Sequence, residues 1–278
     1  MTTCFDLSID NNIAHIVLNR PKAFNSMPRA FWNELPELVR DIDEAAKARV
    51  IVVSSTGKHF TSGMDISVFT DGDTISGADG DPQVRAEAFR RFVLHLQGAF
   101  SCLDHARMPV IAAIQGGCIG GGVDLISACD IRYATEDAFF QIHEINIGMT
   151  ADVGTYPRLC KLIPEGWVRE LSFGGRRLPA AKAKEIGLVN EVFATQEAML
   201  AHAMGLAAEI AEKNPVAVAG AKRMINYARD HSQADALDYI ATWQAGMFSP
   251  AHILEAFAAK SAKRPANFPD LHPLRKKM

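Results

Sequence analysis

Short apolar stretches alternate with longer amphipathic stretches over the first two thirds of the chain. Val50 to Ser55 and Pro109 to Ile114 are continuously apolar, as expected of strands buried on both faces of a sheet. Ile13 to Asn19 is a third short β-type run. In Pro28 to Lys47 and Val84 to Asp104 the apolar residues recur at helical spacing. Strands that alternate with helices in this way predict an α/β fold.

Five glycines fall within Gly116 to Gly122, directly after the second apolar strand. An apolar helical stretch follows at Val123 to Cys129, and short strands are predicted at Ile131 to Ala134 and Ala138 to Ile142. Asp71 to Pro82 is polar and rich in glycine and aspartate, which indicates a surface loop or a short insertion.

From about residue 195 onwards the pattern is almost wholly helical. The helices are predicted at Gln196 to Lys213, Val216 to Asp230, Ala234 to Phe248 and His252 to Lys263. The pattern therefore divides the chain into an α/β core, residues 1–195, and a C-terminal helical region, residues 196–278.

Composition narrows the class of protein. The 278 residues include 29 Lys+Arg and 32 Asp+Glu, so the net charge is -3, and 48% of the residues are hydrophobic. This composition is typical of a globular protein and excludes a disordered chain. The near balance of charge argues against a nucleic-acid partner, and no apolar run reaches the ~18 residues of a membrane span.

The five cysteines and the two ends of the chain bear on its compartment. The cysteine count is odd and no CxxC pair occurs, which argues against a zinc ribbon or a secreted disulfide framework. The first residues lack the basic and apolar pattern of a signal peptide, and Lys276-Lys277-Met278 is not a peroxisomal address. We therefore expect a cytoplasmic enzyme that binds no metal.

Two loops are candidates for binding. The glycine cluster lies at the start of a predicted helix, where free N–H groups can hold an anion, although a tight turn with close backbone packing explains it equally well. His59 to Ile66 follows the strand that ends near Ser55. This loop can direct a backbone N–H at a ligand, or it can be a plain turn in which Asp65 caps a helix.

Three acidic residues lie within apolar surroundings, where a carboxylate is costly unless it is paired or functional. Asp124 follows the glycines, Glu144 follows a predicted strand, and Asp152 precedes a further predicted helix. Structural roles are open to each: a helix-dipole partner for Asp124, an exposed strand end for Glu144 and an N-cap for Asp152. His143 and Glu144 are adjacent, so on a strand they would point to opposite faces.

Three motifs together resemble the enoyl-CoA hydratase/isomerase (crotonase) superfamily. They are Arg20 to Met27 (RPKAFNSM), Phe60 to Ile66 (FTSGMDI) and Gln115 to Asp124 (QGGCIGGGVD). The resemblance extends from about Phe5 to Phe268 and is strongest to the Δ(3,5)-Δ(2,4)-dienoyl-CoA isomerases. Hydratases of the family place glutamates at the positions of Asp124 and Glu144, whereas the dienoyl isomerases have an aspartate at the first position and a third acid at Asp152.

This resemblance implies a crotonase-type ββα spiral core followed by a C-terminal α-helical oligomerisation module, and an activity in fatty-acid β-oxidation. It implies an oxyanion hole made of the Met64 and Gly121 N–H groups, which would stabilise a thioester enolate. A 3,5-diene becomes a 2,4-diene by losing a proton near C2 and gaining one near C6. We expect Glu144 and Asp152 to carry out these two transfers and Asp124 to be a third acid in the pocket.

The resemblance also implies an acyl-CoA thioester as substrate, and CoA enters only as part of that substrate, so no separate cofactor is expected. The residues expected to contact it are Lys22, Ala23, Phe24, Ser62, Gly63, Met64, Asp65, Ile66, Gly121 and Lys263. Lys263 would reach the CoA phosphate from a neighbouring subunit, or it is a solvated helix end. The C-terminal helices are expected to form a homotrimer or homohexamer.

Two alternative functions stay open at this point. A 2-enoyl-CoA hydratase needs two carboxylates that hold a water molecule, and Asp124 is shorter than the usual glutamate. A non-catalytic crotonase-fold protein that binds RNA or serves as a scaffold would account for the fold, but the negative net charge and the intact set of acids count against it.

Overall fold

The computed structural model describes residues 2–70 and 81–274, and its centre is a six-stranded sheet in the order β1-β2-β3-β4-β6-β9. The first strand, β1 (Phe5–Asp10), pairs antiparallel with β2 (Ile13–Leu18). The other strands run parallel to β2 and are β3 (Val50–Ser55), β4 (Val110–Ile114), β6 (Ile131–Thr135) and β9 (Glu191–Phe193).

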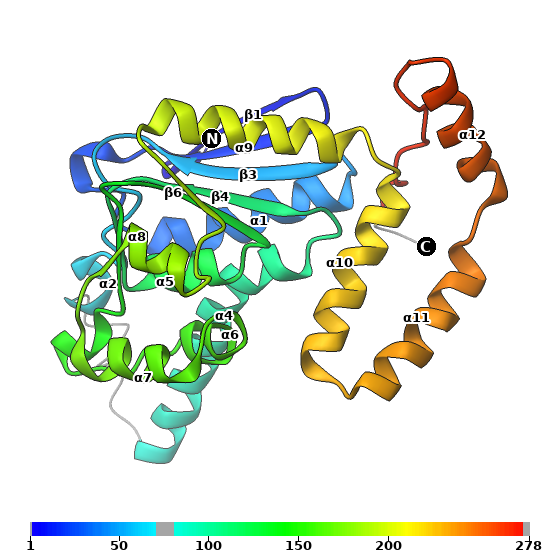
Figure 1. Ribbon diagram of the computed structural model, residues 1–278. Helices are drawn as coiled ribbons and strands as arrows, with labels where there is room; N and C mark the ends of the chain where they lie inside the picture. Colours follow the sequence, from blue (N-terminus) through cyan, green and yellow to red (C-terminus); the bar gives the residue numbers. More distant parts are fainter. Residues whose placement is uncertain (1, 71–80, 275–278) are drawn as a thin grey trace.

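Helices cover both faces of this sheet (Figure 1). On one face lie α1 (Arg29–Glu44), α4 (Pro82–His105) and α5 (Gly121–Ser127), and on the other lies α9 (Gln196–Ala211). Successive residues of β3 point to opposite faces of the sheet. Val50 and Val52 pack against α9, whereas Ile51 and Val53 pack in the cluster that contains α1. The continuous apolar pattern of this strand thus arises from burial on both faces.

A second, three-stranded sheet stands beside the first. It consists of β5 (Gly117–Ile119), β7 (Phe139–Gln141) and β8 (Leu178–Pro179). The shorter helices connected to it are η2 (Glu144–Ile147), α6 (Thr155–Leu162), α7 (Glu165–Gly174) and α8 (Ala180–Glu185). Two further short helices, η1 (Pro21–Ala23) and α2 (Ile66–Thr70), flank the loop after β3.

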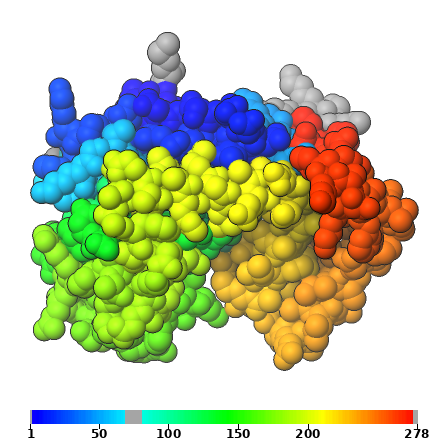
Figure 2. Space-filling model, turned by 45° about the horizontal axis from the view of Figure 1, so that its top comes forward, coloured from blue at the N-terminus to red at the C-terminus, as the bar shows by residue number. Residues whose placement is uncertain are grey.

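The last three helices lie to one side of the sheet (Figures 1 and 2), and the first of them is joined to the core by the buried Lys222, whose Nζ donates to Leu103 O (2.8 Å). They are α10 (Pro215–Asp230), α11 (Gln233–Met247) and α12 (Pro250–Ser261). Several large apolar side chains on α11 and α12 are exposed, among them Leu237, Leu254 and Phe257. The domain division predicted at residue 195 places α9 with these helices, whereas in the structure α9 lies on the sheet and the projecting part begins at Pro215.

The α/β fold and the long elements predicted from the sequence are confirmed. Of the predicted polar loop, residues 71–80 lie outside the described residues, but Asp81 and Pro82 belong to a helix start, because the Asp81 carboxylate accepts hydrogen bonds from the Gln83 and Val84 N–H groups. The helix predicted after Asp152 is α6, whereas the sequence patterns did not predict β1, β5, β8, β9 and the helices α7 and α8. Within the described ranges, no helix combines the length and apolar character needed to cross a bilayer.

Candidate active site

The loop after β3 is held between two other segments. Met27 N–H donates to Gly63 O (2.9 Å) and Asp65 N–H donates to Met27 O (3.0 Å). On the other side, Thr61 and Cys118 form a parallel bridge. Because the residues on both sides of Met64 bond to Met27, the Met64 N–H points away from that segment.

The Met64 nitrogen lies near the start of α5. Gly121 is the first residue of that helix, so its N–H has no acceptor within the helix. A methyl group added to Gly121 would lie 3.9 Å from the Met64 nitrogen and 3.1 Å from Met27 Sδ. The expected pair of oxyanion donors is therefore close together in space, and the tight surroundings of Gly121 explain the glycine.

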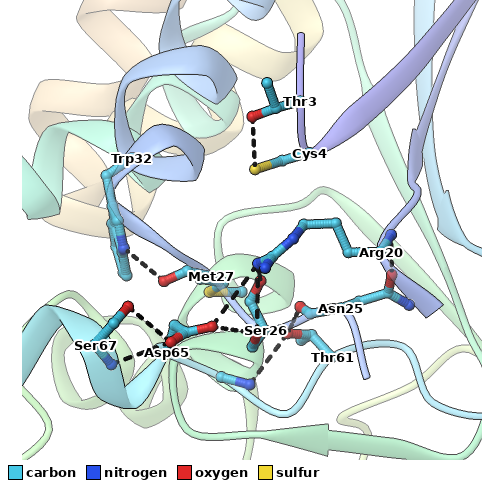
Figure 3. A network of polar contacts seen from close by, with 11 residues as sticks. Thr3, Cys4, Arg20, Asn25, Ser26, Met27, Trp32, Thr61, Asp65 and Ser67 are labelled. Carbon is cyan, nitrogen blue, oxygen red and sulfur yellow. Dashed lines mark hydrogen bonds and ion pairs between the residues drawn. The ribbon is translucent and has the colours of Figure 1, made fainter. Parts of the chain in front are cut away.

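Hydrogen bonds from Asn25 and Thr61 hold the loop after β3 in place (Figure 3). The buried Asn25 side chain donates to Thr56 O (2.8 Å) and to His59 O (3.0 Å). The Thr61 hydroxyl donates to Asn25 O (2.7 Å) and accepts from the Gly63 N–H (3.1 Å). The backbone around Met64 is therefore fixed by contacts that do not involve a ligand.

Asp65 has the capping role that the sequence left open. Its carboxylate accepts hydrogen bonds from the Ser67 N–H (3.1 Å) at the start of α2 and from the Ser26 hydroxyl (2.7 Å). The bonds from Ser26 and Ser67 hold the pKa of Asp65 below its usual range. Asp65 is therefore an ionised helix cap next to the loop.

A cavity of about 80 Å³ opens beside the two N–H groups. The expected site residues that line it are Ser62, Gly63, Met64, Gly121, Glu144 and Asp152. Ile119 and Gly120 of the glycine cluster also line it, and the lining residues that were not expected at the site are Trp32, His143, Ile147, Met149 and Val153. The structure thus brings residues from four separate stretches of the chain to one pocket.

Glu144 reaches the cavity because the chain turns into η2 directly after β7. A methyl group on Gly120 would lie 3.1 Å from Glu144 Oε1, so the carboxylate sits against the backbone at the start of α5. Its Oε2 is buried without a hydrogen-bond partner among the described residues. Burial raises the pKa of Glu144, and the nearby Asp152 carboxylate adds to the rise.

Asp152 lies in the segment between η2 and α6. Its backbone oxygen accepts a hydrogen bond from Gln97 Nε2 of α4 (2.7 Å), which anchors the residue without using the carboxylate. Burial raises the pKa of Asp152. The N-cap of α6 is Gly154, so the alternative role of Asp152 as a helix cap is excluded.

The expectation that His143 and Glu144 point to opposite faces is wrong. That argument assumed a strand, but the strand ends at Gln141 and both residues lie at the start of η2. Both side chains therefore line the same cavity.

Asp124 does not line the cavity. It is fully buried in the first turn of α5, and its Oδ1 accepts hydrogen bonds from Thr155 N–H (2.6 Å) and from the Thr155 hydroxyl (2.7 Å). Burial raises the pKa of Asp124 to about 7, with the Glu144 carboxylate as the next cause, while the Thr155 bonds oppose the rise. Asp124 therefore lies outside the cavity and affects it through its interactions with Glu144 and Thr155.

The raised pKa of Asp124 predicts a change in stability with pH. Folding moves this pKa from 3.8 to about 7, so the native state binds the proton more tightly than the unfolded state. The contribution of the Asp124 proton to the free energy of unfolding is thus fully present below pH 4 and is lost as the pH rises to 7. The whole contribution is on the order of 4 kcal/mol. Asp124→Asn removes this dependence, so urea unfolding should show the variant more stable than the wild type at pH 8.

Glu37→Gln, the same change from carboxylate to amide on the exposed surface of α1, is the control, and its unfolding profile should follow that of the wild type. All profiles are compared at one protomer concentration, because association changes apparent stability. Parallel profiles for the Asp124→Asn variant and the wild type would contradict a proton held at Asp124.

The residues expected to contact CoA fall in two places. Lys22, Ala23 and Phe24 form η1 and its end, which is linked to the loop by a hydrogen bond from the Ser62 N–H to Phe24 O (3.0 Å). Phe24 and Ile66 are 54% and 75% exposed beside the loop. Lys263 follows α12, which lies on the far side of the molecule from α2 and α5, so one chain does not bring this lysine to the cavity (Figure 1).

Trp32 and Thr155 are the most informative residues that the sequence did not single out. Trp32 lines the cavity from α1 and donates from Nε1 to Met27 O (3.3 Å). A buried tryptophan needs such an acceptor, so its position within an apolar helical stripe was a usable signal. Thr155 gave no signal, because its partner Asp124 is 31 residues away in the chain.

Comparison with characterised sequences places this chain among acyl-CoA enzymes. It is 46% identical to the mitochondrial Delta(3,5)-Delta(2,4)-dienoyl-CoA isomerase of Mus musculus, over 92% of this chain and 79% of that protein. It is 38% identical to the peroxisomal enzyme of the same name from Arabidopsis thaliana, over 94% of each chain. These relatives are named mitochondrial or peroxisomal, so the expected cytoplasmic location is wrong.

The fold and the family agree with these relatives. The crystal structure of an enoyl-CoA hydratase from Bacillus anthracis matches with a TM-score of 0.83 and 28% identity, over 98% of this chain and 100% of that one. The profile of the family described as Enoyl-CoA hydratase/isomerase matches residues 8–271. The crotonase-type fold that the motifs implied is confirmed, and the chain belongs to the enoyl-CoA hydratase/isomerase (crotonase) family.

Proposed function

We infer that this protein is a dienoyl-CoA isomerase that converts a 3,5-dienoyl-CoA into a 2,4-dienoyl-CoA. The observation that carries this inference is the presence of two acids, Glu144 and Asp152, on the wall of the cavity that lies beside the Met64 and Gly121 N–H groups. The identity of 46% to an enzyme named for this reaction supports the same conclusion.

The chemistry follows from these groups. A carboxylate removes a proton from C2 of the substrate, and the electron pair spreads over the diene and the thioester carbonyl. Met64 and Gly121 donate hydrogen bonds to the thioester oxygen, where negative charge develops. The second acid delivers a proton to C6, which leaves double bonds at C2 and C4. The reaction neither oxidises nor reduces the substrate, so it needs no cofactor.

Two separated acids suit this reaction because the proton leaves and arrives four carbons apart. Burial raises the pKa of both Glu144 and Asp152, so one can hold a proton while the other is ionised. The nearby charge of Asp152 raises the pKa of Glu144 further, which favours a single negative charge on the pair.

The position of Asp124 argues against a hydratase. Water addition needs two carboxylates that hold one water molecule, and Asp124 would have to be the partner of Glu144. Asp124 is fully buried, lies outside the cavity lining, and has one carboxylate oxygen engaged by Thr155. The second acid in the cavity is Asp152 instead.

The CoA part of the substrate is proposed to lie along η1 and the loop from Ser62 to Ile66. The proposed assembly is a homotrimer or homohexamer built through the C-terminal helices. Exposed apolar side chains on α11 and α12, such as Leu237, Leu254 and Phe257, support this, because a large exposed apolar surface is typical of an interface. In such an assembly Lys263 would serve the CoA phosphate of a neighbouring subunit.

The function is tested by presenting the purified protein with a 3,5-dienoyl-CoA and, separately, with a 2-enoyl-CoA, while following ultraviolet absorbance. We expect the conjugated 2,4-dienoyl chromophore to appear with the first substrate. Loss of the 2-enoyl absorbance together with an unchanged 3,5-dienoyl-CoA would instead identify a hydratase, and RNA binding without turnover of either substrate would identify a non-catalytic protein.

A further inference from the structure

The Asp124 carboxylate lies where three functional elements meet. It belongs to α5, whose first residue is the oxyanion donor Gly121, and its charge acts on Glu144 of η2. Its Oδ1 accepts both polar hydrogens of Thr155, the first residue of α6. Thr155 is itself fully buried, so its hydroxyl makes this bond away from solvent.

The bonds to Asp124 take the place of a helix cap. The N-cap position of α6 is Gly154, which has no side chain to accept the first N–H groups of the helix. Asp124 supplies an acceptor from another helix, at 2.6 Å from the Thr155 nitrogen. The start of α6 is therefore tied to the helix that carries the oxyanion donor.

This tie also determines the position of Asp152. The residue is three positions before Thr155, and its backbone oxygen is held on the other side by Gln97 Nε2 (2.7 Å). The segment from Ala151 to Gly154 is thus anchored at Asp152 by α4 and at its end by Asp124. Release of the second anchor would let the Asp152 carboxylate move relative to Gly121 and Glu144.

We propose that Thr155 is a positioning residue for the proton transfers: by clamping the Asp124 carboxylate, it fixes the segment that carries Asp152 against the oxyanion donor and Glu144. This inference rests on the proposed isomerase function. Thr155 does not line the cavity, so its role is to position other groups and not to act on the substrate directly.

The clamp also affects the charge of Asp124. The charged and titratable groups that act on it are Glu144 from η2 and Arg158 from α6, and it acts in turn on Cys118 of β5. The hydrogen bonds from Thr155 favour the ionised Asp124 carboxylate, so they lower its pKa while burial raises it. Loss of the Thr155 hydroxyl therefore raises the pKa of Asp124. A purely structural role for Thr155 would not produce this shift.

The test compares Thr155→Val, which keeps the shape and loses the hydroxyl, with Thr155→Ser, which keeps the hydroxyl. We expect T155V to lower kcat for 3,5-dienoyl-CoA on the order of tenfold, with KM within about twofold of the wild type, because a misplaced catalytic group weakens the chemical step more than binding. The T155S variant should restore kcat. If T155V does not fold, Thr155→Ala carries the same expectation.

A second readout does not depend on turnover. The infrared carbonyl band of the protonated Asp124 is identified by its absence in the D124N variant, and it is titrated in the ligand-free enzyme. In T155V this band should disappear at a higher pH than in the wild type and in T155S. An unshifted titration of the Asp124 band, or equal kcat in T155V and the wild type, would contradict the positioning role of Thr155. A wild-type enzyme that fails to isomerise the diene while the band still shifts would overturn the proposed function and leave the clamp standing.

Discussion

Changing Asp152 to asparagine lowers kcat for the double-bond shift on the order of 10³-fold and leaves KM for the acyl-CoA within a few-fold of the wild type. Asparagine has the size of aspartate but neither accepts nor releases a proton at neutral pH. The anchor from Gln97 uses the backbone oxygen of residue 152, so the substitution leaves that bond in place. The result is read from initial rates of 2,4-dienoyl absorbance over a range of substrate concentrations.

Glu37→Gln on α1 also replaces a carboxylate by an amide, on the exposed surface, and it should retain wild-type kcat. Unfolding curves for both variants check that each is folded at the assay temperature. Turnover of the Asp152→Asn variant at a wild-type rate would remove Asp152 from the proton-transfer pair and leave Glu144 to move both protons.

The fold could be predicted in its long elements because burial on both faces leaves a clear mark in sequence. Val50 to Ser55 is apolar throughout, and the structure places it between α9 and the helices of the other face. β5 left no such mark, because its three residues lie within the glycine cluster and pair with β7, which is distant in the chain. Short elements of this kind are set by tertiary contacts that no local pattern records.

The candidate site was predictable as a set of residues but not as a geometry. Family motifs pointed to Met64, Gly121, Glu144 and Asp152, and the structure gathers all four at one cavity. The same motifs could not separate Asp152 on the cavity wall from Asp124 behind it, because spacing along the chain does not determine burial. The role of Thr155 is a contact between two helices, so it follows only from the three-dimensional structure.

The proposed oxyanion hole depends on a close approach of two backbones at Gly63. This residue has a φ of +86°, and a methyl group on it would lie 2.7 Å from Ile119 O and 3.5 Å from the Gly121 nitrogen. Alanine at this position therefore meets backbone atoms, which cannot rotate away as a side chain can. The strand-like segment from Thr61 to Met64 would have to move away from β5, and the Met64 N–H would move with it.

We therefore expect Gly63→Ala to lower kcat by on the order of 10²- to 10³-fold, the range found when one oxyanion donor is lost. The matched control is Gly187→Ala, because Gly187 has a φ of +85° but only an ordinary contact, 3.8 Å from Leu162 O. Both variants carry the backbone strain of alanine in the left-handed region, roughly 1–2 kcal/mol, and the Gly63 variant should lose more stability because its methyl group also meets backbone atoms. Only the Gly63 variant should lose turnover. Equal activity in the two variants would show that the Met64 N–H is not needed to stabilise the enolate, whatever the two substitutions do to the melting temperature.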